Sequence, residues 1–108
     1  IFNSKRSVCP LALPGGGPVL GHSKDFKFET YSEVLITGDR LFLYTDGLIE
    51  ARNADEIFYE KSRMNQVMRS SLDLSPKLAA ERLISDVNKH MRGEPYQDDV
   101  TFLIVDVR

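Results

Sequence analysis

Two acidic sites in the sequence have the residue types and positions that metal-assisted chemistry needs. Asp46 lies just after the apolar run Leu41–Tyr44, and the pair Asp98 and Asp99 precedes the β-rich run 100–107. A carboxylate at the end of an apolar strand lies in low-dielectric surroundings. Carboxylates close to one another repel, and they bind a proton or a cation to relieve this repulsion. Because these oxygen ligands occur without clustered Cys or His, the sequence favours Mg²⁺ or Mn²⁺ over Zn²⁺.

The same acidic residues also have ordinary structural interpretations. Neighbouring strand residues face opposite sides, so we expect one of Asp98 and Asp99 to ligate an ion and the other to support it. An Asp-Gly after a strand is, however, a common hairpin turn, and an Asp pair before a strand can be a solvated cap. Spacing alone leaves both interpretations open. A plain antiparallel structural domain is the interpretation that remains if Asp46 and Asp98 lie far apart.

The sequence offers no convincing covalent nucleophile. Cys9 lies in an apolar stretch without a nearby Cys or His, which indicates a buried spectator thiol. His22 and His90 are single and far apart in sequence, so we expect surface or packing roles for them. The glycine-rich stretch Pro14–Pro18 must form a loop, and it lacks the flanking pattern of a phosphate-binding loop.

Length, composition and net charge limit the classes of protein to which this chain can belong. With 108 residues and 42% hydrophobic residues, the chain is long enough for one domain with one core. A net charge of -2 argues against a nucleic-acid partner, which requires a clustered surplus of Lys and Arg. No apolar run approaches the roughly 18 residues of a membrane span, so no membrane contact is expected. The single cysteine fits a reducing, cytoplasmic location.

The first half of the sequence predicts strands. Ile1–Leu13 suggests one or two short strands near a sheet edge. The alternation in Asp25–Thr30 predicts a strand that buries its two phenylalanines on one face. The continuous apolar run Leu41–Tyr44 predicts a strand buried on both faces, and Val100–Val107 predicts the last strand.

The second half predicts two helices. The first is expected over Glu60–Ser71, and the second begins with Ser75 as N-cap and Pro76 as first residue and ends at Gly93. Met64, Val67, Met68 and Ser71 fall on one face of the first helix, and Ala80, Leu83, Val87 and Met91 make the apolar face of the second. Methionines at helical spacing indicate core packing rather than a set of soft metal ligands.

The order of the elements predicts the fold class. The polar stretch Arg52–Glu56 is expected to form a loop that Ile57 and Phe58 hold against the core. Several strands, two helices and a final strand favour an α+β fold with a mostly antiparallel sheet covered by helices.

Three segments together resemble one family. They are Gly17–Gly21 (GPVLG), Thr37–Asn53 (TGDRLFLYTDGLIEARN) and Gln97–Thr101 (QDDVT). They are similar to the protein phosphatase 2C-like (PPM) superfamily, in the bacterial branch typified by the stage II sporulation phosphatase and the stress-response sigma-factor regulatory phosphatases. The resemblance spans nearly the whole chain, and the segments occur in the expected order.

The resemblance implies a fold, a site and a reaction. The fold would be an α/β/β/α sandwich, and residues 1–108 would be the C-terminal portion of this single phosphatase domain. By similarity, Asp46 and Asp98 are catalytic metal ligands for Mn²⁺ or Mg²⁺, and Asp99 has a supporting role. Two ions are implied in the intact domain. Metal-activated water would hydrolyse phosphoserine or phosphothreonine directly, without a covalent phosphoenzyme.

The resemblance also implies a partner and a limit on activity. The substrate would be a phosphorylated regulatory protein of the anti-sigma factor antagonist type. The family's earlier motifs, an Asp ligand ahead of a Gly-His-Gly-type segment, are expected upstream of Ile1, and His22 does not replace them. We therefore expect the chain alone to be inactive or nearly so, and to self-associate through uncovered strand edges, for example as a homodimer. The alternative is a catalytically inactive PPM-like binding or regulatory module.

Overall fold

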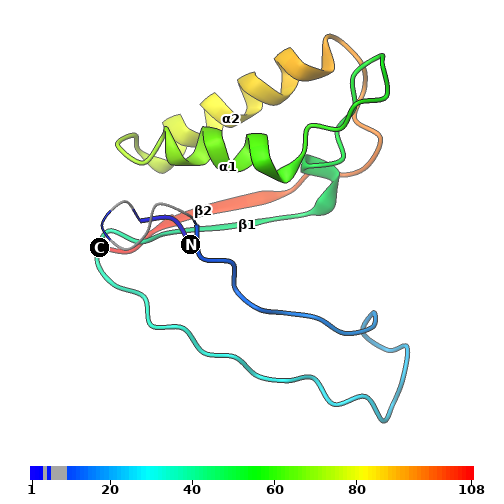
Figure 1. The fold of residues 1–108 in the computed structure, drawn as a ribbon, viewed down its shortest axis with the longest axis vertical. Helices are drawn as coiled ribbons and strands as arrows, with labels where there is room; N and C mark the ends of the chain where they lie inside the picture. The colour runs from blue at the N-terminus through cyan, green and yellow to red at the C-terminus, as the bar shows by residue number, and fades with distance from the viewer. Residues whose placement is uncertain (4, 6–9) are drawn as a thin grey trace.

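The helices and strands of the chain form two layers. The structure is a computed structural model that describes residues 1–3, 5 and 10–108. In chain order the elements are strand β1 (Arg40–Tyr44), the 3-10 helix η1 (Asp46–Leu48), helix α1 (Lys61–Arg69), helix α2 (Pro76–Met91) and strand β2 (Phe102–Asp106). Both α-helices lie on the same side of the strand pair (Figure 1). The predicted α+β class is confirmed, whereas the two-sheet sandwich stays a prediction.

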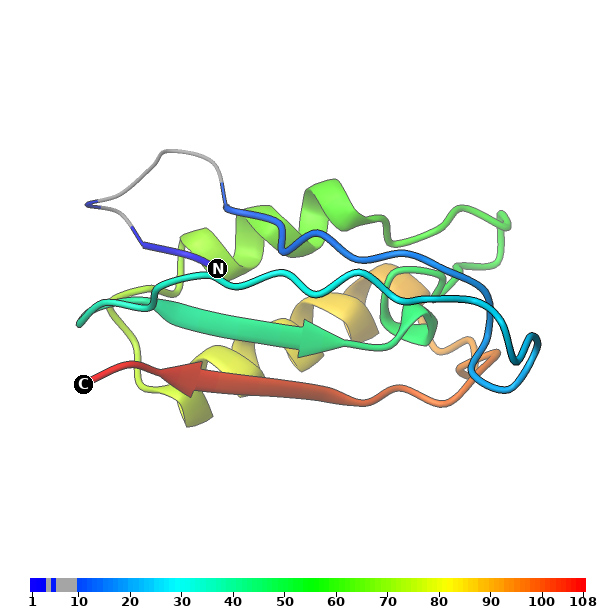
Figure 2. The same ribbon diagram turned by 90° about the horizontal axis from the view of Figure 1, so that it is seen from below.

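The sheet consists of β1 and β2, which pair antiparallel side by side (Figure 2). Arg40 lies opposite Asp106 at one end of the register, and Tyr44 lies opposite Phe102 at the other. Phe42, Tyr44, Phe102 and Ile104 pack against the helices, whereas Leu43, Leu103 and Val105 are 48%, 56% and 41% exposed. The prediction that Leu41–Tyr44 is buried on both faces is therefore wrong. Helices cover only one face, and alternate side chains point to the other.

Both predicted helices are present within a residue or two of their expected ends. The Ser75 hydroxyl accepts a hydrogen bond from the backbone N–H of Leu78 at 3.4 Å, and Pro76 is the first helical residue of α2. Arg92 ends α2 in the left-handed conformation at φ 54°, and Gly93 follows at φ 96°. In the apolar face of α2, Ala79 rather than Ala80 is buried. Ala79 lies four residues before Leu83 and so shares its side of the helix.

The core forms between the helices and the covered face of the sheet. Its buried members are Phe2, Leu48, Ala51, Tyr59, Met64, Met68, Leu83, Val87 and Met91. The three methionines are thus core residues, as predicted. Ile57 and Phe58, predicted to hold the loop onto the core, are 54% and 46% exposed, and Tyr59 takes that position at 1% exposure. The buried Tyr59 hydroxyl donates to the Asp86 carboxylate at 2.7 Å, so its hydrogen-bonding capacity is satisfied.

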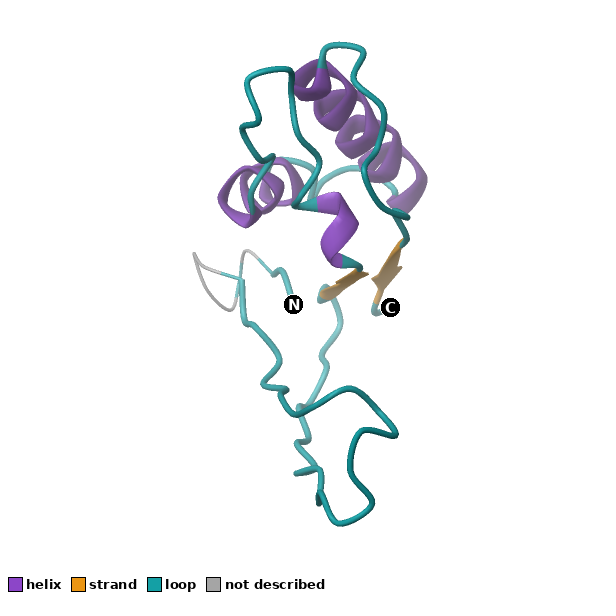
Figure 3. Cartoon of the chain, turned by 90° about the vertical axis from the view of Figure 1, so that its right-hand side faces the viewer, coloured by secondary structure: helices purple, strands orange, loops and turns teal. Residues whose placement is uncertain are grey.

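The segment 10–38 contains no helix or strand and extends away from the sheet on the side opposite the helices (Figures 1 and 3). The predicted strand Asp25–Thr30 is therefore wrong. Phe26 and Phe28 are 43% and 48% exposed and contact each other edge to face, with ring centroids 4.8 Å apart. A strand needs a hydrogen-bonded partner strand, and among the described residues no strand pairs with 25–30, although the two rings lie against Gly17. The loop at Pro14–Pro18 is confirmed.

In its described residues, 1–3, 5 and 10–13, the N-terminal segment contains no strand and contributes an isolated antiparallel bridge between Phe2 and Arg40. The one or two short strands predicted for Ile1–Leu13 are therefore absent from these residues, and residues 4 and 6–9 lie outside the described part of the chain. Cys9 lies outside the described residues, so its predicted burial stays a prediction. Over the described residues, no helix combines the length and the apolar character needed to cross a membrane.

Arg40 joins the start of β1 to both β2 and the connection between the helices. Its guanidinium donates to the Asp106 carboxylate at 2.6 and 2.8 Å, to the Ser71 carbonyl at 2.8 Å and to the Leu74 carbonyl at 2.7 Å. The planar, multiply donating guanidinium suits such a buried junction. This anchor holds the end of the sheet opposite η1.

Candidate functional site

Asp46 lies where β1 turns into η1. The carbonyl of Asp46 accepts hydrogen bonds from the backbone N–H groups of Ile49 and Glu50, both at 2.9 Å, which closes the short helical turn. Gly47 and Leu48 are buried beneath this turn, whereas Asp46 itself is exposed. The Asp-Gly sequence therefore does not form the hairpin turn that was its simplest structural interpretation. It directs an exposed carboxylate out from a tightly packed backbone.

Asp98 and Asp99 lie in the irregular segment that leads into β2. Both are exposed, and β2 begins only at Phe102, so the strand alternation expected for the pair does not apply. One carboxylate oxygen of Asp98 accepts a hydrogen bond from the backbone N–H of Asp99 at 2.7 Å. This local bond restricts the rotation of the Asp98 side chain.

The backbones that carry Asp46 and Asp98 contact each other directly. The Thr45 hydroxyl accepts a hydrogen bond from the Thr101 N–H at 3.0 Å and donates to the Asp99 carbonyl at 3.1 Å. A Cβ atom placed on Gly47 would lie 2.5 Å from the carbonyl oxygen of Asp99. Only glycine permits this approach. The fold thus brings the two acidic segments, about fifty residues apart in sequence, to one end of the sheet.

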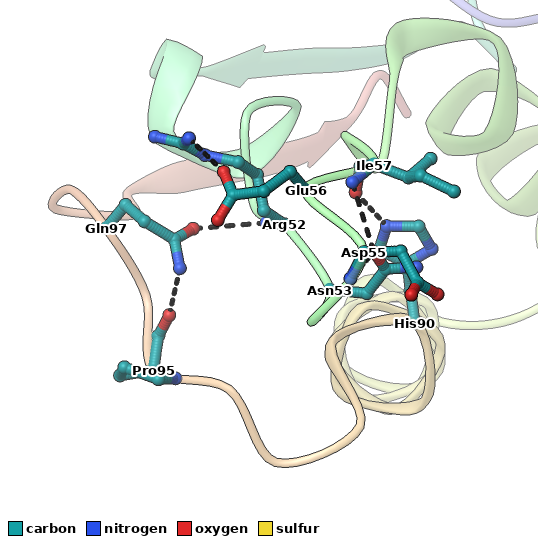
Figure 4. A network of polar contacts seen from close by, with 8 residues as sticks. All are labelled: Arg52, Asn53, Asp55, Glu56, Ile57, His90, Pro95 and Gln97. Carbon is teal, nitrogen blue, oxygen red and sulfur yellow. Dashed lines mark hydrogen bonds and ion pairs between the residues drawn. The ribbon is translucent and has the colours of Figure 1, made fainter.

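A second bridge joins the same two segments further along (Figure 4). The side-chain oxygen of Gln97 accepts a hydrogen bond from the Arg52 backbone N–H at 3.1 Å, and its amide nitrogen donates to the Pro95 carbonyl at 2.5 Å. The Arg52 guanidinium pairs with Glu56 at 2.5 Å and lies over the Phe58 ring. The acidic segment is therefore held on both sides of Asp98.

Sequence reasoning missed three residues of this region: Thr45, Gly47 and Gln97. Each is next to one of the predicted aspartates, and all three lie within the segments Thr37–Asn53 and Gln97–Thr101 that carry the family resemblance. Each makes a contact to the other acidic segment, and a single sequence does not show which segments meet in space.

The donor chemistry of the site fits a hard divalent cation in part. Asp46 and Asp98 provide exposed carboxylate oxygens of the kind that Mg²⁺ and Mn²⁺ prefer. Across residues 1–3, 5 and 10–108, however, no group of three or more His, Cys, Asp or Glu side chains is arranged to hold a metal ion. An ion here would keep several water ligands or take further ligands from elsewhere, which Mg²⁺ does readily.

A second cluster of titratable groups serves packing. Asp86 on α2 accepts hydrogen bonds from the Tyr59 hydroxyl at 2.7 Å and from the Arg63 guanidinium at 2.8 and 3.2 Å. The bond from Arg63 lowers the pKa of Asp86, and burial together with the bond to Asp86 raises the pKa of Tyr59. His90 contacts the Ile57 carbonyl at 2.9 Å and the Arg63 guanidinium at 3.3 Å. This is the packing role predicted for it.

The fold and the paired acidic segments define an α+β domain with carboxylates at the strand ends. The family model described as Stage II sporulation protein E (SpoIIE) matches residues 2–108. The chain belongs to this family, which is a family of PPM-type, protein phosphatase 2C-like domains. No curated protein and no solved structure matches the chain significantly.

Proposed function

We propose that this chain forms part of a metal-dependent protein serine/threonine phosphatase, with Asp46 and Asp98 as ligands of Mn²⁺ or Mg²⁺. The observation that carries the proposal is the contact between Gly47 and the Asp99 carbonyl, which leaves no room for a side chain. This contact brings together the two segments that bear the aspartates. It also argues against a purely structural domain, which required Asp46 and Asp98 to lie far apart.

Each residue of the site has a separate task in the proposal. The ion, when bound, supplies a Lewis acid for phosphoryl oxygens and makes water more acidic. Asp46 and Asp98 hold the ion, while the Asp99 N–H orients the Asp98 carboxylate at 2.7 Å. Thr45 keeps the two segments at a constant spacing. Because Asp46 and Asp98 are exposed, a phosphorylated side chain on another protein can reach them.

Membership of the SpoIIE family supports a substrate that belongs to the signalling systems in which related phosphatases are expected to act. We propose a phosphoserine or phosphothreonine on a regulatory protein of the anti-sigma factor antagonist type, in the cytoplasm. The exposed sheet face at Leu43, Leu103 and Val105 supports self-association as a homodimer.

One observation favours a second function, a PPM-like binding or regulatory module without catalysis. The described residues lack a group of three or more ligating side chains arranged for a metal ion. The two functions differ in whether Asp46 and Asp98 bind Mn²⁺ together.

Calorimetric titration with Mn²⁺ tests the proposal. We expect the chain to bind Mn²⁺ and expect Asp46→Asn and Asp98→Asn each to weaken binding by about tenfold or more, since each removes a ligand. Asp73→Asn, an exposed aspartate in the connection between α1 and α2, is the matched control and should bind normally. Equal binding by all four proteins would favour the binding module.

Turnover of p-nitrophenyl phosphate and of a phosphoserine protein completes the test. Assays should use both the 108-residue chain and any longer polypeptide that contains it. We expect activity near background for the chain alone, because two carboxylates hold a two-metal centre poorly. Clear activity of the chain alone that Asp46→Asn abolishes would contradict this expectation.

A further inference from the structure

The segment that carries Asp98 has little support of its own. Residues 92–99 are all exposed, and neither helix nor strand runs from Arg92 to Thr101. Tyr96 donates a hydrogen bond to the Asn88 side chain at 3.2 Å, and Thr45 holds the far end through Asp99 and Thr101. Between these two anchors the Asp98 backbone lies near Gly47, and the neighbouring Gln97 side chain reaches across to the Arg52 backbone.

The Gln97 amide uses both of its polar atoms. The oxygen accepts from the Arg52 N–H at 3.1 Å, and the nitrogen donates to the Pro95 carbonyl at 2.5 Å. Exchanging the two atoms would set a donor against an N–H and an acceptor against a carbonyl, so the contacts define the orientation of the amide. A carboxylate could make only the first bond. The site thus requires an amide at this position to make both bonds.

The Arg52 N–H is a stable point of attachment. The preceding residue, Ala51, is buried, and its carbonyl accepts a hydrogen bond from the Tyr59 N–H at 2.8 Å. Arg52 itself forms an antiparallel bridge with Phe58. Gln97 therefore ties an exposed segment to a backbone that the core holds in place.

We propose that Gln97 is a positioning residue that sets the place of the Asp98 carboxylate relative to Asp46. This inference rests on the proposed function, because the two carboxylates matter together only if they share an ion. Gln97 touches neither the substrate nor the ion in this proposal. It acts through the backbone of Asp98, in the way that groups outside the ligand set orient metal ligands.

Gln97→Met is the decisive variant, since it keeps the length of the side chain and removes both hydrogen bonds. Calorimetry should show an about tenfold increase in the Mn²⁺ dissociation constant. Amide hydrogen exchange at Arg52 should accelerate, while the thermal midpoint stays close to that of the wild type. Gln97→Glu keeps the acceptor for Arg52 and should retain more protection of that amide than Gln97→Met. Gln66→Met, the same change at an exposed position on α1, is the control.

The outcomes separate the two proposals. If Mn²⁺ binds through Asp46 and Gln97→Met binds it equally well, the positioning role is wrong and the proposed function stands. Weaker binding without faster exchange at Arg52 would also overturn the role, because the bridge would not be the cause. If neither the wild type nor Asp46→Asn binds Mn²⁺, the proposed function and the positioning role fail together.

Discussion

The two segments that carry the aspartates differ in how they are supported. The Asp46 segment, residues 44–60, buries Gly47, Leu48, Ala51 and Tyr59 under the helices. The Asp98 segment, residues 92–101, contains no fully buried residue; Val100 packs against the core at its end, and the rest is attached through hydrogen bonds. One carboxylate of the candidate site is thus placed mainly by core packing, and the other mainly by polar contacts. Local stability follows such differences in burial.

This difference has a consequence for metal binding. A segment held by packing moves only when the core is disturbed, whereas a segment held by exposed hydrogen bonds adjusts at little cost. Substitutions in the Asp46 segment should therefore lower global stability. Substitutions in the Asp98 segment should alter Mn²⁺ affinity with little effect on stability.

Gly47→Ala should have the largest effect, because Gly47 is where the two segments touch. Its Cβ would lie 2.5 Å from the Asp99 oxygen and 3.2 Å from the Asp99 carbonyl carbon, so backbone must move. We expect a loss of about 1 to 3 kcal/mol in the free energy of unfolding and a marked loss of Mn²⁺ affinity. Urea unfolding and calorimetry measure the two quantities. Gly15→Ala, where a Cβ meets nothing within 4 Å, is the control, and an equal effect there would refute the explanation.

Tyr59→Phe compares the segments by the same chemical change in each. Removing the Tyr59 hydroxyl takes a hydrogen bond from the partly buried Asp86 carboxylate and should cost about 1 to 2 kcal/mol of stability. Tyr96→Phe removes an exposed bond to Asn88 and should change stability by less than about 0.5 kcal/mol. Thermal unfolding of both variants checks the difference. Equal losses would mean that the two segments are equally supported.

Thr45→Val tests the junction without altering its shape. The Thr101 N–H loses its acceptor and the Asp99 carbonyl loses a donor, but water reaches this exposed site, so we expect a cost of about 1 kcal/mol. Mn²⁺ affinity should fall as well, because the spacing of the segments relaxes. Thr45→Ser keeps the hydroxyl and lacks only the methyl group, so its stability and Mn²⁺ affinity should stay near those of the wild type. If both fell in Thr45→Ser as they do in Thr45→Val, the methyl group rather than the hydroxyl would be responsible.

Of these tests, lowering the pH should change the free energy of unfolding least, and it should act through two carboxylates outside the candidate site. The guanidiniums of Arg63 and Arg40 lower the pKa values of Asp86 and Asp106 below the ordinary 3.8. A lowered folded pKa stabilises the protein above pH 3.8, and this contribution is lost as the pH falls through the folded value. The urea midpoint should thus decline as the pH falls below 3.8.

The double variant Asp86→Asn and Asp106→Asn is the matched test of this acid effect. It removes both titrating groups, so its urea midpoint should depend less on pH over the same range. Asp73→Asn, exposed between the two helices, should keep the wild-type dependence. A decline of equal steepness in the double variant would assign the acid effect to other groups.

The sequence by itself determined the helices, the final strand and the identity of the acidic residues. Apolar spacing and the Ser75–Pro76 start specify α2 locally, since helical hydrogen bonds close within a few residues. The chemistry of a carboxylate likewise belongs to the residue itself. These features could be predicted because they depend on near neighbours in the chain.

Tertiary structure alone decided what depends on distant partners. The alternation in Asp25–Thr30 is a valid strand pattern, yet a strand forms only beside another, and Leu41–Tyr44 is covered on one face because helices lie on one side. The contact of Gly47 with Asp99 and the bridge from Gln97 to Arg52 join residues about fifty positions apart. Such pairings depend on the packing of the whole chain, and neither residue type nor local spacing specifies them.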